Sequence, residues 1–122
     1  MQPTNVVLLQ SDPNIARTLA TSLSSSFHRV QIATSLNDLR HAAAKHHPFA
    51  FIVDLETATL GEVESLKRDF TDVRIVCNHR VADEEMWASS LNVGADDCCR
   101  SSDLGGIVFA VVQTPIARTV AA

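Results

Sequence analysis

The sequence predicts a doubly wound α/β domain in which five parallel strands alternate with five helices. Five short apolar runs rich in Val, Ile, Leu and Phe recur along the chain, and a segment with helical periodicity follows each run. Strand–helix alternation with short connections favours right-handed βαβ units, so we expect one parallel sheet with helices on both faces. The runs are apolar throughout rather than alternating, as is typical of strands buried on both sides.

The strands are predicted from these apolar runs. The first is the β-branched run NVVLL, and the third, FAFIVD, is the most apolar. The flavodoxin-like strand order 2-1-3-4-5 suits five units of this length better than the six-strand dinucleotide-binding order. The strands are expected at 5–9, 28–33, 49–54, 72–78 and 96–99.

The helices are predicted from periodicity and from capping residues. Asp12 is a candidate N-cap with Pro13 at the first helical position. Thr34 or Ser35 is expected to cap the second helix. Two glycines weaken the prediction for the last helix. The helices are expected at 13–26, 34–46, 61–70, 82–93 and 102–112.

Length and charge limit the possible functions. The 122 residues suffice for one domain with a core, expected at 1–113, with a tail or the start of a linker at 114–122. The net charge of −4 and the scattered basic residues give no electrostatic basis for binding nucleic acid or a membrane. The lack of a spanning segment and of a signal peptide, with three cysteines, favours a cytoplasmic location.

Polar residues follow the predicted strands directly. In open α/β sheets, sites lie at the carboxyl ends of the strands, so these side chains should meet there. The segment QSDPN has no glycine, which argues against a phosphate-binding loop, and no nucleophile–base pair can be assembled, so we expect no enzyme. The expected site residues are Gln10, Ser11, Asp12, Asp54, Glu56, Asn78, His79, Arg100 and Ser101.

On these segments the chain resembles the receiver domain of bacterial response regulators, over about residues 5 to 113. VVLLQSDP is similar to the family's first strand and its acidic turn, and VRIVCN to its fourth strand. FAFIVDL resembles the strand that ends at the phospho-accepting aspartate, which falls on Asp54. SLNVGADDCC resembles the family's Ala-Leu-x-x-Gly-Ala-x-x-Tyr segment, with Leu91, Gly94 and Ala95 in register.

Several positions depart from the pattern that the resemblance implies. The family's acidic pair falls on Gln10 and Ser11, and Asp12 is the next position of that turn. The hydroxyl residue after the fourth strand falls on Asn78, or on His79 if the loop is shifted. The lysine after the fifth strand falls on Ser101, beside Arg100, and the following proline falls on Ser102.

These departures predict an atypical receiver with impaired phosphorylation that acts mainly as a protein–protein interaction module. In the family, Mg²⁺ is held by the acidic pair, the acceptor and a backbone carbonyl, which here belongs to Glu56. This sequence offers only Asp12, Asp54 and that carbonyl, so we expect weak Mg²⁺ binding or none, and no other cofactor. Asp54 is then expected to cap the strand end and to bond Ser11 or Asn78.

Two alternatives stay open at this stage. The first is a working receiver that is phosphorylated on Asp54 through a remodelled metal site using Asp12, Glu56 and Arg100. The second is a flavodoxin-like domain that binds a nucleotide or a flavin, against which the glycine-free first turn argues.

The fourth helix suggests where a partner would bind. Ala88 and Leu91 are expected to face the core, which leaves Trp87 beside that stripe and near the surface. In receivers, the fourth helix, fifth strand and fifth helix form the usual signalling and dimer surface. We therefore expect a protein partner, an output domain or a homodimer there, with Trp87 as a candidate anchor.

The cysteines are expected to be structural. Cys77 is predicted in the core, and Cys98 and Cys99 follow each other on a strand, so their side chains should point to opposite faces. No Cys/His spacing matches a zinc site.

Overall fold

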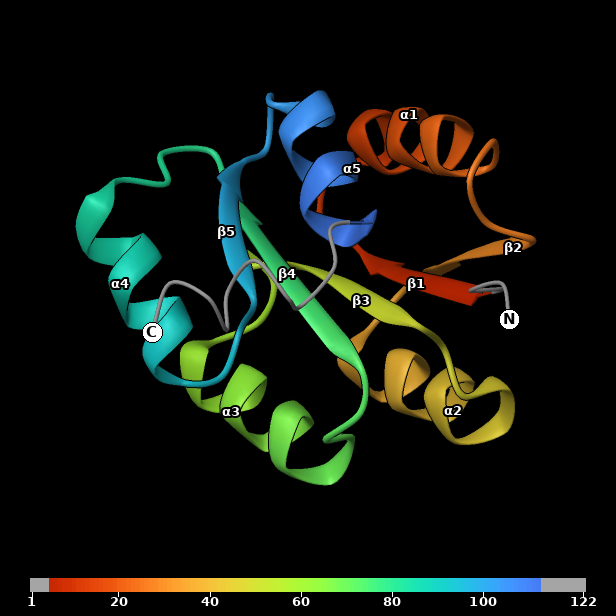
Figure 1. Ribbon diagram of the computed structural model, residues 1–122, viewed down its shortest axis with the longest axis horizontal. Helices are drawn as coiled ribbons and strands as arrows, with labels where there is room; N and C mark the ends of the chain where they lie inside the picture. The colour runs from red at the N-terminus through yellow and green to blue at the C-terminus, as the bar shows by residue number, and fades with distance from the viewer. Residues whose placement is uncertain (1–4, 113–122) are drawn as a thin grey trace.

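The computed structural model describes residues 5–112 and confirms the predicted fold class (Figure 1). Five strands form one parallel sheet in the order β2-β1-β3-β4-β5. The strands are β1 (Asn5–Leu9), β2 (Arg29–Ala33), β3 (Ala50–Asp54), β4 (Arg74–His79) and β5 (Asp97–Arg100). The helices are α1 (Pro13–Leu23), α2 (Leu36–His46), α3 (Leu60–Asp69), α4 (Glu84–Asn92) and α5 (Leu104–Val112).

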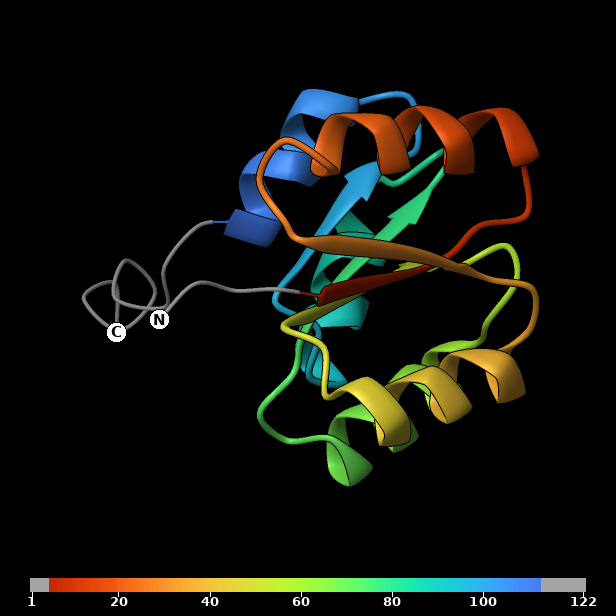
Figure 2. The same cartoon turned by 90° about the vertical axis from the view of Figure 1, so that its right-hand side faces the viewer.

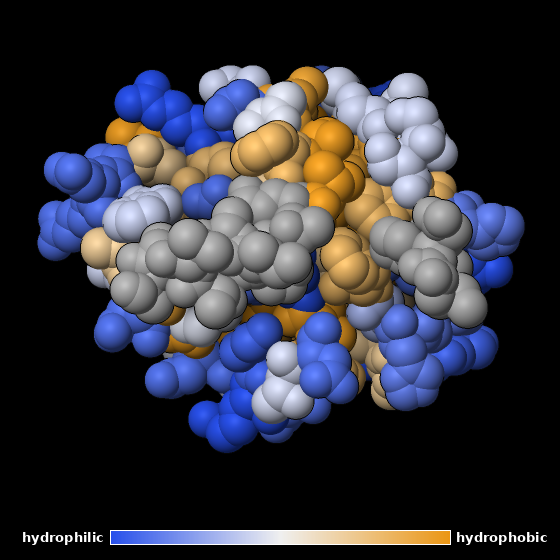
Figure 3. Space-filling view, in the orientation of Figure 1, coloured by the Kyte–Doolittle hydropathy of each residue, from blue (hydrophilic) through white to orange (hydrophobic). Residues whose placement is uncertain are grey.

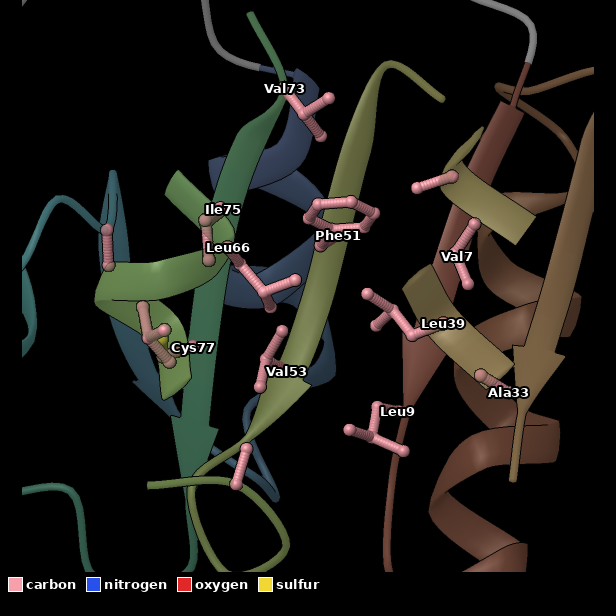
Figure 4. Close-up of a cluster of buried hydrophobic side chains, with 14 of the residues drawn as sticks. Val7, Leu9, Ala33, Leu39, Phe51, Val53, Leu66, Val73, Ile75 and Cys77 are labelled. Carbon is pink, nitrogen blue, oxygen red and sulfur yellow. The ribbon is translucent and has the colours of Figure 1, made fainter. Parts of the chain in front are cut away.

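The helices cover both faces of the sheet. α1 and α5 lie against one face, and α2, α3 and α4 lie against the other (Figures 1 and 2). An apolar cluster fills each interface. Phe51, Leu66 and Ile75 belong to the cluster beneath α2 and α3 (Figure 4), whereas Leu19 and Ile107 join the sheet to α1 and α5. Each fully buried side chain of this size contributes roughly 1.5–3 kcal/mol, so this packing holds the helices in place.

The cap residues explain where the helices begin. The Asp12 carboxylate accepts hydrogen bonds from the backbone of Asn14 at 2.8 Å and Ile15 at 3.4 Å, as predicted. Of the two candidates for the second helix, Ser35 is the N-cap. Thr59 caps α3 in a capping box that the sequence analysis did not predict. The predicted first helix ran to 26, whereas α1 ends at Leu23.

The predicted core face of the fourth helix is wrong. Ala88 is exposed and Leu91 is only half-buried, whereas Met86 packs against the core and Ser90 is fully buried. The Ser90 hydroxyl donates to the backbone oxygen of Trp87 at 2.8 Å, so the buried hydroxyl has a hydrogen-bond partner. Apolar periodicity misses this stripe because one of its members is a serine.

Gly94 is required by the turn between α4 and β5. Its φ is +108°, and an added Cβ would lie 2.8 Å from Cγ of Lys67. We expect Gly94→Ala to lower the free energy of unfolding by about 1–3 kcal/mol in a urea titration. Gly105→Ala is the matched control, because its added Cβ meets nothing within 4 Å; it should raise stability by about 0.5–1 kcal/mol. A Gly94→Ala variant as stable as the wild type would contradict this account of the turn.

Candidate functional site

A cavity of about 450 Å³ opens at the carboxyl edge of the sheet. It lies where the sequence places the site, among the turns that follow β1, β3, β4 and β5. Its lining residues are Gln10, Ser11, Asp12, Pro13, Ile15, Asp54, Glu56, Arg80 and Ser101.

Asp54 lies at the end of β3 and is 1% exposed. Oδ2 accepts hydrogen bonds from Ser11, from its backbone N–H at 2.9 Å and from its hydroxyl at 2.5 Å. The Thr57 hydroxyl donates to the same oxygen at 3.4 Å, and the backbone N–H of Glu56 donates to Oδ1 at 2.9 Å. Donors from the same chain therefore engage both carboxylate oxygens. Of the two predicted partners, Ser11 bonds Asp54 and Asn78 does not.

Asn78 instead lies at the centre of an uncharged hydrogen-bond network beside Asp54. It is fully buried, its side-chain amide donates to Oε1 of Gln10 at 2.7 Å, and its oxygen accepts from the Ser101 hydroxyl at 2.9 Å. Asn78 is the register partner of Asp54, so it, and not His79, takes the place next to the candidate acceptor. The network links the ends of β1, β4 and β5 with satisfied, uncharged groups.

The other expected site residues lie at the rim or outside the cavity. His79 accepts a hydrogen bond from the backbone of Val81 at 3.0 Å, and its register partner Arg100 is exposed and does not line the cavity. The basic residue that does line it is Arg80, whose guanidinium lies 2.9 Å from the Glu56 carboxylate. Sequence reasoning missed Arg80, although it directly follows β4 and the same edge rule could have found it. Because its side chain is 77% exposed, this ion pair contributes little to stability.

These side chains do not fit the Mg²⁺ site that the resemblance implies. Mg²⁺ requires oxygen lone pairs, usually from one or two carboxylates, in near-octahedral geometry. The Asp12 carboxylate caps α1, that of Glu56 pairs with Arg80, and that of Asp54 faces N–H and O–H donors. Within residues 5–112, no group of three or more His, Cys, Asp or Glu side chains is arranged to hold a metal ion.

Large exposed apolar side chains lie outside the cavity, on α4 and α5. Trp87 is 45% exposed, and its indole N–H donates to the Asp97 carboxylate at 3.1 Å, which links α4 to β5. On α5, Phe109 is 66% exposed and Val112 is 42% exposed. In the view of Figure 3, hydrophobic surface gathers where Figure 1 draws α5, whereas hydrophilic surface dominates the lower rim over α2 and α3.

Cys77 and Cys98 are buried and Cys99 is half-buried, and Cys98 and Cys99 point to opposite faces of the sheet, as predicted. Cys77 and Cys98 belong to the cluster on the α3 side of the sheet, and Cys99 packs against the cluster on the opposite face. Burial raises the pKa of Cys99 to about 12, with further contributions from the charges of Asp97 and Asp103. Burial also raises the pKa of Cys77 and Cys98.

We expect the raised thiol pKa values to make alkylation slow and folding stability sensitive to alkaline pH. At pH 8, iodoacetamide should label the folded chain on the order of 10²–10³ times more slowly than the urea-unfolded chain, because only the thiolate reacts.

The unfolded thiols lose protons above about pH 8.5, whereas the folded Cys99 thiol keeps its proton up to about pH 12. Stability should therefore fall as the pH rises across this window. Equal labelling of both states, read by mass, would contradict this picture.

Comparison with known proteins gives structural likeness only. Within the described residues, no helix combines the length and the apolar character that crossing a bilayer would require. No protein-family model matches the chain, and no curated protein matches its sequence.

Solved structures with a similar architecture include response regulators. One from Burkholderia pseudomallei, with a phosphorylated aspartic acid, a calcium ion and citrate, is 21% identical with a TM-score of 0.79, covering 97% of this chain and 71% of that one. The receiver domain of the Francisella response regulator 1452 is 13% identical, with a TM-score of 0.78 and coverage of 99% and 100%. A response regulator from Thermotoga maritima is 13% identical, with a TM-score of 0.79 over both whole chains. The chain therefore has the flavodoxin-like fold of response regulator receiver domains.

Proposed function

We propose that this chain is an atypical receiver domain of two-component or phosphorelay-type signalling, which acts mainly as a protein–protein interaction module with impaired phosphorylation. One observation carries the proposal: hydrogen-bond donors of the same chain engage both oxygens of Asp54. The Burkholderia response regulator has a phosphorylated aspartic acid and a calcium ion. In this proposal Asp54 takes the acceptor's place but lacks the groups that such a reaction needs.

The groups that this site lacks are charged side chains. Phosphoryl transfer requires cations that neutralise charge on the transferring oxygens. The positions that would hold the metal carry the neutral side chains of Gln10 and Ser11, and the position of the lysine carries Ser101. Gln10 and Ser101 instead bond to Asn78, so the site is stabilised without an ion. Arg80 is the basic residue in the lining, and it is paired with Glu56.

A magnesium titration tests the proposal without requiring a partner. The backbone amides of Ser11 and Glu56 donate to Asp54, so their NMR resonances report directly on its carboxylate. We expect millimolar Mg²⁺ to leave both resonances in place, apart from the uniform drift that the same concentration of Na₂SO₄ causes. Saturable movement of both resonances at low ionic strength would favour the working receiver with a remodelled metal site.

We propose that partners bind the surface formed by Trp87 on α4, Asp97 on β5, and Gly105, Phe109 and Val112 on α5, named here the α4–α5 surface. The three α5 residues share one helix face because they are spaced by four and three positions. Among the described residues, an added Cβ at Gly105 meets nothing within 4 Å, which leaves room for close approach of another element. Partly exposed aromatic side chains of this kind supply much of the energy of protein interfaces.

Trp87→Ala is expected to weaken association through this surface without unfolding the domain. Truncating an anchor costs about 2 kcal/mol or more, so self-association measured by sedimentation should weaken roughly 30-fold. Ile32→Ser is the matched control, because Ile32 is 44% exposed but lies on β2, at the opposite edge of the sheet. If the wild type stays monomeric, the homodimer is excluded and the surface is left for a different protein or an output domain. Equal weakening by both variants would contradict the placement of the surface.

A further inference from the structure

A buried positive charge lies at the amino ends of the strands, whereas Asp54 lies at their carboxyl ends. Arg74 is the first residue of β4, at the amino edge, and is 8% exposed. Its guanidinium carbon lies 5.7 Å from the centroid of the Phe49 ring. Phe49 in turn contacts Phe27, with ring centroids 5.8 Å apart. The guanidinium therefore lies against the Phe49 ring, in a residue that is largely shielded from solvent.

The described part of the chain offers this charge no anionic partner. Arg74 Nε is buried and has no hydrogen-bond partner. The ion pairs within residues 5–112 join Arg40 to Asp69 and Arg80 to Glu56, and neither includes Arg74. The backbone N–H of Arg74 donates to the Phe49 carbonyl at 3.0 Å, so the unsatisfied hydrogen-bond donor is on the side chain. Attraction to one aromatic ring offsets only part of the desolvation of a cation.

A purely structural role does not require an arginine here. Covering the Phe49 ring requires only an apolar side chain, which Met or Leu would supply without burying a charge. A long side chain that covers apolar surface normally keeps its charged head in water. Arg74 does not follow this pattern, because the residue is 8% exposed and its Nε is buried without a partner.

We propose that Arg74, with Phe27 and Phe49, forms a binding site for a carboxylate on an Asp or Glu side chain of a partner protein. A single planar guanidinium matches one carboxylate, with two parallel donors. The C-terminal end of α5 reaches the same edge (Figure 2), and its partial negative charge disfavours a doubly charged phosphate more than a singly charged carboxylate. The two segments outside the described residues, MQPT and QTPIARTVAA, contain no Asp or Glu, so they cannot supply such a side chain. The inference is independent of the proposed function, because Asp54 lies at the other edge.

NMR of the Arg74 side chain in the full chain tests this site. The Nε–Hε resonance is followed during titration with acetyl-Phe-Glu-amide and, at equal ionic strength, with acetyl-Phe-Gln-amide or inorganic phosphate. We expect a saturable downfield shift with the Glu peptide, and binding at least about tenfold weaker for the neutral peptide and for phosphate. The Glu peptide should also raise the unfolding temperature of the wild type, but not that of Arg74→Met. Arg74→Lys, which keeps the charge but not the planar donors, should lose most of this effect.

Three results would overturn the proposal. The first is an equal response to the Glu and Gln peptides, because the carboxylate would then contribute nothing. The second is a stronger response to phosphate, which would make the site one for a different anion. The third is an Arg74 Nε–H that is already hydrogen-bonded in the free chain and unmoved by any probe, because a terminal segment would then fill the site. The wild-type titration decides among these even if the Arg74 variants fold poorly.

Discussion

Replacing Asp54 by Asn is expected to lower the free energy of unfolding by about 2 kcal/mol, because the site is built around a charged acceptor. Donors approach both oxygens, from Ser11 on one side and from the backbone of Glu56 on the other. An Asn side chain has one acceptor and one donor group, so either orientation turns an NH₂ towards a backbone N–H, that of Ser11 or that of Glu56. In a pocket of clustered carboxylates, the same change would instead relieve repulsion and stabilise the domain.

Thermal and urea unfolding measure this difference. Asp12→Asn is the matched control, because Asp12 is an exposed acid of the same cavity and Asn is an equally good N-cap. The control should stay within about 0.5 kcal/mol of the wild type. A gain in stability for Asp54→Asn would mean that the cavity holds uncompensated negative charge, as a metal-binding site does.

Restoring the missing charges is expected to convert the chain into a phosphorylatable receiver. The triple variant Gln10→Asp, Ser11→Asp, Ser101→Lys places two carboxylates and one ammonium group in the turns that line the cavity. Without metal, the clustered acids should destabilise the domain. Mg²⁺ should restore stability by about 2.7 kcal/mol at a concentration 100 times its dissociation constant. With Mg²⁺ and acetyl phosphate, intact mass should then show one phosphoryl group per chain.

The control for this gain is the same triple variant carrying Asp54→Asn, which should acquire no adduct. The wild type measured in parallel should show neither a Mg²⁺-dependent stability nor an adduct. A folded triple variant that ignores Mg²⁺ would mean that these three positions do not correspond to the metal and lysine positions of a receiver.

The fold could be predicted because its signals are local. Asp12 and Pro13 mark the start of α1 by cap chemistry, and the run that ends at Asp54 is apolar enough to be a buried strand. The strand order followed from the number of units and the rule for parallel sheets. The core face of α4 was missed because a buried Ser90 does not register as apolar.

The residues of the site could be predicted from the sequence, but the hydrogen bonds between them could not. The rule that sites lie at the carboxyl ends of parallel strands identified Gln10, Ser11 and Asp54, because these strands end together. It could not state that Asn78 bonds Gln10 and Ser101 rather than Asp54, since this depends on side-chain rotamers and on the β3–β4 register. Arg74 was not singled out either, because an arginine at the start of a strand is ordinarily exposed.

The most direct test of the central claim is the intact mass of the wild-type chain after incubation with acetyl phosphate and Mg²⁺. The account predicts an unchanged mass for the wild type and for Asp54→Asn alike, because Asp54 bonds to its own chain and the basic residue that lines the cavity, Arg80, is paired with Glu56. A stoichiometric gain of one phosphoryl group, lost in Asp54→Asn, would contradict it and establish a working acceptor in a site without the acidic pair.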